Sequence, residues 1–119
     1  MKTKTAKITA NGLTRQALIT LNSAGYHVWR QNNGGVYDPK IKRFRANSST
    51  PGISDIIGFH KKSGQFVAIE IKIGRDKLSP FQERFISDVL RAGGLARVIK
   101  TPDELEELHK ELKPQKFSK

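Results

Sequence analysis

The chain is most informative at residues 65–73, which read Gln65-Phe66-Val67-Ala68-Ile69-Glu70-Ile71-Lys72-Ile73. Successive side chains of a β-strand point to opposite faces of its sheet. One face of this stretch is entirely β-branched and is predicted to lie in the core: Val67, Ile69, Ile71 and Ile73. The other face includes Glu70 and Lys72, which therefore point the same way, about 7 Å apart at roughly 3.3 Å per residue.

The segments on either side extend this strand into a sheet. Residues 54–59 predict a second strand, joined to the first by the turn Lys61-Lys62-Ser63-Gly64 as an antiparallel hairpin. Ser79, Pro80 and Gln82 form a helix start with an N-cap, a first-turn proline and a capping-box glutamine, so residues 80–92 predict a helix. Because that helix is a crossover, the strand expected at 95–99 is a parallel neighbour of the hairpin.

The outer segments complete the predicted order α-β-β-β-α-β-α. An apolar helical stripe covers residues 11–24 and ends at Gly25, and a strand with a core Trp29 follows at 26–30. Residues 31–52 are polar and predict a long loop, and a last helix begins at Pro102. We therefore expect an α/β fold with a central mixed β-sheet flanked by helices. A single domain would occupy 11–112, between a basic arm at 1–10 and a basic tail at 113–119.

The charge of the chain predicts a polyanionic partner. Lys and Arg number 22 against 11 acids, which gives a net charge of +11 and a pI near 10.2. Five acids lie near the C-terminus, so residues 1–100 hold 18 Lys and Arg against six acids, a net charge of +12. Nucleic acid is the partner that such a charge favours. The alternative is a basic surface that serves solubility alone.

Two further counts narrow the class of protein. The chain has no cysteine, which excludes disulfides and cysteine-ligated zinc and is typical of a reducing compartment. Its apolar runs are short, so no membrane partner is expected. We predict an intracellular location, in the cytoplasm of a bacterial or phage-infected cell or associated with the nucleoid.

Asp55 and Glu70 together form a candidate metal site. Asp55 falls in the first predicted strand, among Ile53, Ile56 and Ile57, where a lone carboxylate is costly. A divalent cation would offset that cost, and two converging acids suit Mg²⁺. In the alternative interpretation, Glu70 and Lys72 are a solvated ion pair on an exposed strand face and Asp55 only caps a strand.

These residues together resemble a known nuclease motif. Gly52-Ile53-Ser54-Asp55 followed by Ala68-Ile69-Glu70-Ile71-Lys72 is similar to the bipartite motif of the PD-(D/E)xK nucleases. Trp29-Arg30-Gln31-Asn32-Asn33-Gly34, the helix start Leu78-Ser79-Pro80-Phe81-Gln82 and the turn Gly93-Gly94 narrow the resemblance to the virus-type replication-repair nucleases, the VRR-NUC domains. The resemblance covers roughly residues 11 to 105.

The resemblance implies a restriction-endonuclease-like core and a phosphodiester hydrolase. Asp55, Glu70 and the backbone carbonyl of Ile71 would bind Mg²⁺ or Mn²⁺, which polarises a phosphate oxygen and lowers the pKa of a bound water. Lys72 would orient that water and offset charge developing on phosphorus, with Gln82 close by. Members often carry an acid in the first helix, whereas residues 11–24 contain none and Gln16 is the nearest substitute. The number of metal ions therefore stays open.

The predicted substrate is DNA, held by eight residues that contact it: Arg30, Asn33, Lys40, Lys42, Arg43, Arg45, Arg75 and Lys77. Most of these would fix phosphates and read no bases. Stand-alone members are similar to Holliday-junction resolvases, which implies a homodimeric endonuclease that selects branched DNA. Two other functions compete with this hypothesis: a non-catalytic basic nucleic-acid-binding module, and a basic interaction or structural protein.

Overall fold

The computed structural model describes residues 8–31, 36–45 and 50–112. Along the chain it contains α1 (Ala10–Ser23), β1 (Tyr26–Arg30), β2 (Val36–Asp38), β3 (Arg43–Arg45), β4 (Ile56–His60), β5 (Phe66–Ile71), α2 (Pro80–Arg91), β6 (Leu95–Ile99) and α3 (Pro102–Leu112). Within these described residues, no helix combines the length and apolar character needed to cross a membrane.

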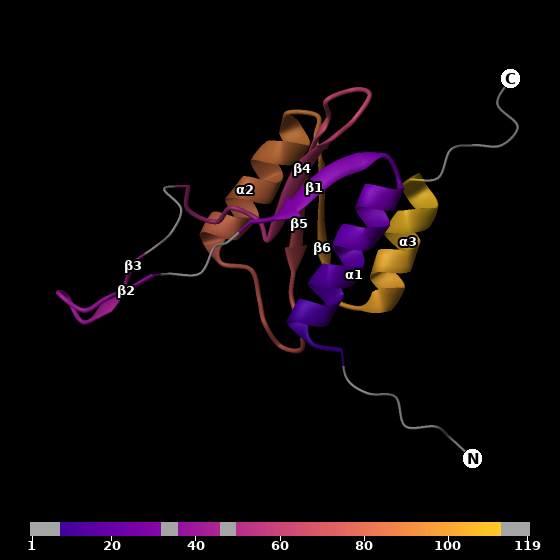
Figure 1. The fold of residues 1–119 in the computed structure, drawn as a ribbon. Helices are drawn as coiled ribbons and strands as arrows, with labels where there is room; N and C mark the ends of the chain where they lie inside the picture. The colour runs from indigo at the N-terminus through magenta and orange to yellow at the C-terminus, as the bar shows by residue number, and fades with distance from the viewer. Residues whose placement is uncertain (1–7, 32–35, 46–49, 113–119) are drawn as a thin grey trace, which may run out of the picture.

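One four-stranded sheet, in the order β1-β4-β5-β6, carries the fold. The β4–β5 pair is antiparallel, as the hairpin pattern predicted, and β5 pairs with β6 in parallel. The helices form two further layers: in Figure 1, α2 lies on one side of the sheet, and α1 and α3 lie together on the other. The predicted mixed sheet with flanking helices is therefore confirmed.

The strand β5 lies between the two helix layers and packs against both. Its β-branched face lies in the main core with α1 and α3, where Val67 and Ile69 are fully buried and contact residues such as Leu13 and Leu108. Its other face meets α2 through Ala68, which packs with Val89. Glu70 lies on this second face, since side chains two residues apart in a strand share a face. The predicted core face of the strand is confirmed.

The helix ends follow the sequence signals. The Ser79 hydroxyl accepts a hydrogen bond from the Gln82 amide, and the Gln82 side chain accepts one from the Ser79 amide, so the capping box is formed. Thr9 caps α1 by accepting from Gly12. Gly25 follows α1 in a left-handed conformation (φ 96°), which a residue with a Cβ rarely adopts.

Three expectations about local structure were wrong. The loop predicted at 31–52 contains a separate two-stranded hairpin, β2–β3, which extends away from the main sheet in Figure 1. Asp55 lies in a bend before the first hairpin strand, because β4 begins at Ile56. Trp29 is 43% exposed and is not part of the core, because its face of β1 extends beyond the strands that α2 covers.

Gly52 fixes the segment before Asp55 against the first turn of α2. A Cβ at Gly52 would lie 2.3 Å from the carbonyl of Phe81 and 2.6 Å from the amide nitrogen of Gln82. The residue also has a φ of +76°. Only glycine permits both the conformation and the contact, so Gly52 sets the distance between Asp55 and the start of α2.

We predict that Gly52→Ala destabilises the protein more than Gly64→Ala. Gly64 has nearly the same backbone conformation (φ 78°), but no atom lies within 4 Å of its added Cβ. Gly64→Ala therefore costs only the positive φ, about 1 kcal/mol. Gly52→Ala adds an overlap with backbone and should cost roughly 1–3 kcal/mol more. Urea denaturation of both variants measures the difference, and equal losses would show that the contact at Gly52 is not tight.

Candidate active site

Four polar side chains from three parts of the fold meet at the end of β5. Asp55 comes from the bend before β4, Glu70 from β5, Lys72 from just beyond β5, and Gln82 from the first turn of α2. They are brought together because β4 and β5 are hydrogen-bonded neighbours and α2 packs on the Glu70 face of the sheet.

Backbone hydrogen bonds orient Asp55. Its Oδ2 accepts a hydrogen bond of 2.8 Å from the amide of Ile71, and its carbonyl accepts one of 2.7 Å from the amide of Gln31. The residue thus connects the ends of β1 and β5.

Glu70 is a buried acid with one satisfied and one unsatisfied oxygen. The residue is 1% exposed. Its Oε2 accepts a hydrogen bond of 2.8 Å from Gln82 Nε2 and lies 3.6 Å from Lys72 Nζ. Its Oε1 is buried and has no hydrogen-bond partner among the described residues. A buried acceptor without a partner is uncommon in folded proteins and calls for a physical explanation.

Burial and a like charge make Glu70 harder to ionise. Burial, followed by the charge of the nearby Asp55 carboxylate, raises the pKa of Glu70 to about 7 against the opposing effect of Lys72. Lys72, whose Nζ lies 3.6 Å from Oε2, therefore offsets only part of this rise in pKa. A solvated ion pair on an exposed strand face does not describe these two residues, since their side chains are only 2% and 16% exposed.

Gln82 has two roles at once. Its amide oxygen closes the capping box with Ser79, and its amide nitrogen donates to Glu70. The capping box thereby fixes the side chain that holds the buried carboxylate. Gln82 and Lys72 approach the same oxygen of Glu70, so the glutamine lies close to the lysine, as the resemblance implies.

The acids fit a hard divalent cation. Asp55 and Glu70 offer carboxylate oxygens, the donors that Mg²⁺ and Mn²⁺ prefer, and Oε1 of Glu70 has no protein donor. Within the described residues no group of three or more His, Cys, Asp or Glu side chains gathers as a metal cage. Gln16, the candidate substitute in the first helix, lines a groove between α1 and α3 with Glu106 and His109. Two carboxylates with few other protein ligands are typical of a site that leaves room for substrate oxygens.

Lys72 opens onto a hollow large enough for a phosphate. The hollow has a volume of about 400 Å³ and is lined by Lys72, Asp76, Lys77, Leu78, Glu83, Val98 and Lys100. Lys100 was missed by the sequence reasoning. The parallel pairing of β5 with β6 could have indicated it. The amide of Lys72 donates to the carbonyl of Ile99, which brings the next residue, Lys100, beside the site.

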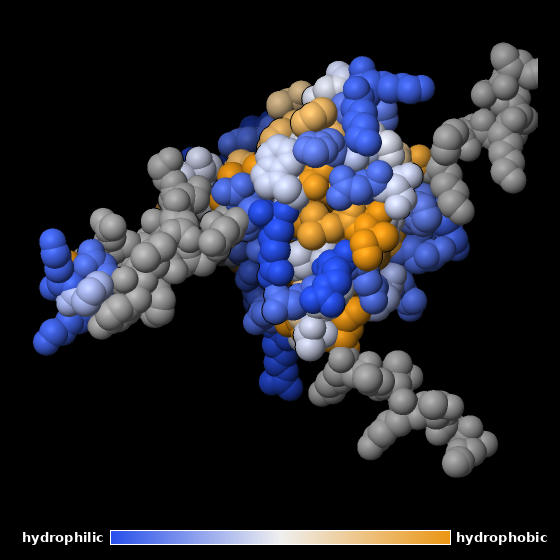
Figure 2. Space-filling model, in the orientation of Figure 1, coloured by the Kyte–Doolittle hydropathy of each residue, from blue (hydrophilic) through white to orange (hydrophobic). Residues whose placement is uncertain are grey.

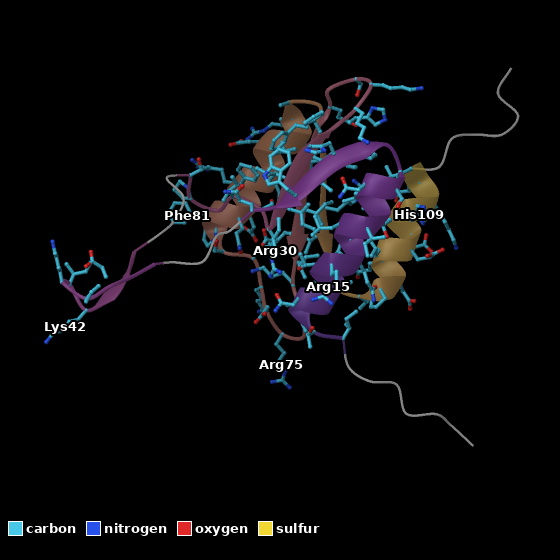
Figure 3. The ribbon with its side chains drawn as sticks, in the orientation of Figure 1. Arg15, Arg30, Lys42, Arg75, Phe81 and His109 are labelled. Atoms are coloured by element: carbon cyan, nitrogen blue, oxygen red, sulfur yellow. The ribbon has the colours of Figure 1, made fainter. Side chains whose placement is uncertain are left out.

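The predicted DNA-binding residues lie in several places. Arg75 and Lys77 are exposed in the segment after β5, and Lys40 and Lys42 are exposed in the turn between β2 and β3. In Figure 3, Arg30 and Arg75 lie on the lower half of one face together with Arg15, whereas Lys42 extends from the distant hairpin. Figure 2 shows strongly hydrophilic side chains over this lower half.

The other predicted DNA-binding residues are Arg30, Asn33, Arg43 and Arg45. Arg30 donates a hydrogen bond to Asn11 and is exposed. Arg43 and Arg45 belong to β3, but their side chains lie outside the described residues, as does the whole of Asn33.

Comparisons with known proteins identify a family and a solved structure of similar fold. The model of the VRR-NUC domain family matches residues 36–102, more than half of the chain. A Holliday junction resolvase, Hjc from the archaeal hyperthermophile Archaeoglobus fulgidus, is similar in structure with a TM-score of 0.45 and 21% identity. The likeness covers 73% of this chain and 65% of the resolvase, so the chain spans less than two thirds of that protein. A comparison with curated proteins finds no match.

We predict that the metal-free protein loses stability as the pH rises from about 4.5 to about 7. Glu70 has its ordinary pKa of 4.5 in the unfolded chain and one near 7 in the fold, so the folded state binds more protons across this window. By linkage, the free energy of unfolding then falls with increasing pH. Urea denaturation in EDTA measures it, and Glu70→Gln, which cannot ionise, should lack this component. Identical pH profiles for the two proteins would contradict the assignment.

Proposed function

We propose, from the premise that this chain belongs to the VRR-NUC domain family, that it is a metal-dependent DNA endonuclease. The family match makes it a nuclease domain with a restriction-endonuclease-like sheet. The finer proposal is that it hydrolyses phosphodiester bonds of DNA with Mg²⁺ or Mn²⁺ as cofactor.

A single observation carries the proposal: the buried, unpartnered Oε1 of Glu70 beside Asp55. The charge of the Asp55 carboxylate raises the pKa of Glu70, and a cation between the two acids would offset this repulsion. An ion bound by Asp55, Glu70 and the Ile71 carbonyl would satisfy the unpartnered oxygen and remove the repulsion. When bound, it would supply a polarised phosphate oxygen and a bound water of lowered pKa.

The chain's own groups have separate tasks in this proposal. Lys72 faces both Glu70 and the hollow, so its ammonium group can orient the attacking water and offset negative charge on the phosphate. Gln82 holds the Glu70 carboxylate in place. Lys77 and Lys100, which line the same hollow, would contact the neighbouring phosphates of the strand.

We further propose a branched DNA substrate and a C₂ homodimer. A domain with one active site cuts both strands of a junction when two copies pair symmetrically. The solved structure that resembles this chain is named as a Holliday junction resolvase. The net charge of +11 favours DNA, and phosphate contacts would come from Arg30, Asn33, Lys40, Lys42, Arg43, Arg45, Arg75 and Lys77. A nuclease that acts on branched DNA would work inside the cell, where such DNA forms.

One observation favours a second function, a non-catalytic nucleic-acid-binding module. The first helix has no acid, and its candidate substitute Gln16 lies in the α1–α3 groove. A site with only two carboxylates binds metal less tightly than one with three. This module would bind DNA in a salt-dependent manner and would yield no metal-dependent products.

We predict that Glu70→Ala and Lys72→Ala each lower DNA cutting at least 100-fold while DNA affinity changes less than a few-fold. Removing a group that acts only in the reaction reduces the rate and leaves remote phosphate contacts intact. A nicking assay on linear, flapped and four-way DNA, with Mg²⁺, Mn²⁺ or EDTA, measures the rate. Sedimentation velocity of the same protein–junction mixtures reports the number of copies bound.

The matched control is Lys110→Ala, an exposed lysine of α3, the helix that packs on the side of the sheet opposite to α2 and the acids. It should cut at nearly the rate of the unchanged protein. Cutting that survives in Glu70→Ala, or the absence of metal-dependent products from every substrate, would refute the nuclease proposal. A monomer on the four-way junction would refute the dimer alone.

A further inference from the structure

Three aromatic rings form an exposed cluster on the main sheet. His27 and Trp29 come from β1 and Phe59 comes from β4; we call them the aromatic surface. The ring centroids of His27 lie 5.6 Å from Trp29 and 5.4 Å from Phe59. Trp29 is 43% exposed and Phe59 is 41% exposed. Large aromatic side chains gathered at a surface usually mark a place where something binds.

The aromatic surface continues directly from the candidate active site. In the sheet, Trp29 pairs with Ile57, and Ile57 pairs with Ala68. Glu70 follows Ala68 by two residues in β5, so its side chain lies on this same face. Trp29 lies two strands across from Glu70, roughly 10 Å at about 4.8 Å per strand, and one step of about 7 Å along the sheet, so their backbones are roughly 12 Å apart. Asp55 comes just before β4, the strand between them, and a further step along the sheet leads to His27 and Phe59.

No helix covers the aromatic surface within the described part of the chain. The helix α2 packs over β5 and β6, where Phe85 and Val89 meet Ala68 and Ala96, and it reaches only as far as Ile57 on β4. Two exposed cations, Lys61 and Lys62, follow β4 at the Phe59 end of the surface. Arg30, the residue after Trp29, points to the opposite face of the sheet, where it donates to Asn11 of α1. Apolar rings with positive charge at their rim complement a nucleic-acid strand, which offers flat bases and a negative backbone.

We propose that the aromatic surface stacks the unpaired bases of a DNA strand whose phosphate lies at Asp55 and Glu70. The inference rests on the proposed function and adds the form of its substrate: single-stranded nucleotides beside the scissile phosphate, as at a flap or an opened branch point. Rings stack on any base, so the contact selects unpaired DNA without reading its sequence. Bases in a closed duplex do not offer their faces to such a surface.

A second copy of the chain is the other candidate occupant. A protein surface resting on Trp29 would lie on β1, next to the strand that Asp55 precedes, and would obstruct the approach of a phosphate. His27, the ring between the other two, is polar, whereas the core of a protein–protein interface is mostly apolar. Both features favour a strand of DNA over a second copy.

Trp29 is the single tryptophan of the chain and therefore reports on its own contact. The experiment titrates the full chain with unlabelled oligothymidylate, and separately with a duplex of the same length, in EDTA so that no cutting occurs. Stacking should quench the tryptophan fluorescence with the single strand and leave it nearly unchanged with the duplex. Anisotropy of a labelled oligothymidylate should show about 10-fold weaker binding for Trp29→Ala, and nearly full binding for Trp29→Phe.

The matched control is Ile19→Ala, a side chain of α1 that is 62% exposed and lies on the other layer of the fold. Its affinity for oligothymidylate should equal that of the unchanged protein. Unchanged binding by Trp29→Ala, or equal quenching by single strand and duplex, would overturn the proposal. The proposal would also be overturned if the tryptophan fluorescence of the protein alone changes on dilution and Trp29→Ala is monomeric in sedimentation velocity. A second copy would then cover the surface.

The two proposals fail separately. Because binding is measured without metal, quenching can be complete in a protein that cuts nothing, which would refute the nuclease proposal alone. Metal-dependent cutting of flapped DNA that is equally fast in Trp29→Ala would refute the stacking proposal alone.

Discussion

The carboxylate of Glu70 lies between β5 and α2, where burial opposes its charge. Several features of the fold are arranged around this acid. Gln82 donates to one of its oxygens, Lys72 approaches the same oxygen at 3.6 Å, and the other oxygen has no donor among the described residues. A well-packed core would carry an apolar side chain at this position of the strand. The stability of the metal-free fold does not explain this acid, because burial opposes its charge.

Hydrogen bonds and a close backbone contact hold Asp55 and Gln82 beside Glu70. Asp55, just before β4, is held by the amide of Ile71 at the end of the neighbouring strand β5. The segment before it is fixed by Gly52, whose missing side chain allows contact with the first turn of α2. The capping box of α2 then fixes Gln82. Hydrogen bonds and one close backbone contact thus set the site, and its groups come from rigid elements of the sheet and helix.

Much of this arrangement was predictable from the sequence because each element has a strong local signal. The alternation in residues 65–73 defined the central strand and its core face, and the capping residues Ser79 and Gln82 defined the start of α2. The acids and the lysine followed from the motif, and the structure brings them together. Their catalytic roles remain predictions.

Other features depend on which elements cover which strand, and no local pattern reports that. Trp29 has the apolar character of a core residue, yet α2 stops short of β1 and leaves it exposed. The hairpin β2–β3 has strands of only three residues in a polar segment, too short for a periodic signal. Lys100 reaches the site only through the parallel pairing of β5 with β6, a contact between segments far apart in the chain.

The most direct test is anomalous X-ray diffraction from crystals of the protein soaked in Mn²⁺. The account predicts an anomalous difference peak between the carboxylates of Asp55 and Glu70, at roughly 2.0–2.3 Å from their oxygens, and its loss in Asp55→Asn. A crystal soaked at high Mn²⁺ concentration that shows no peak there, with Oε1 of Glu70 still without a partner, would contradict it.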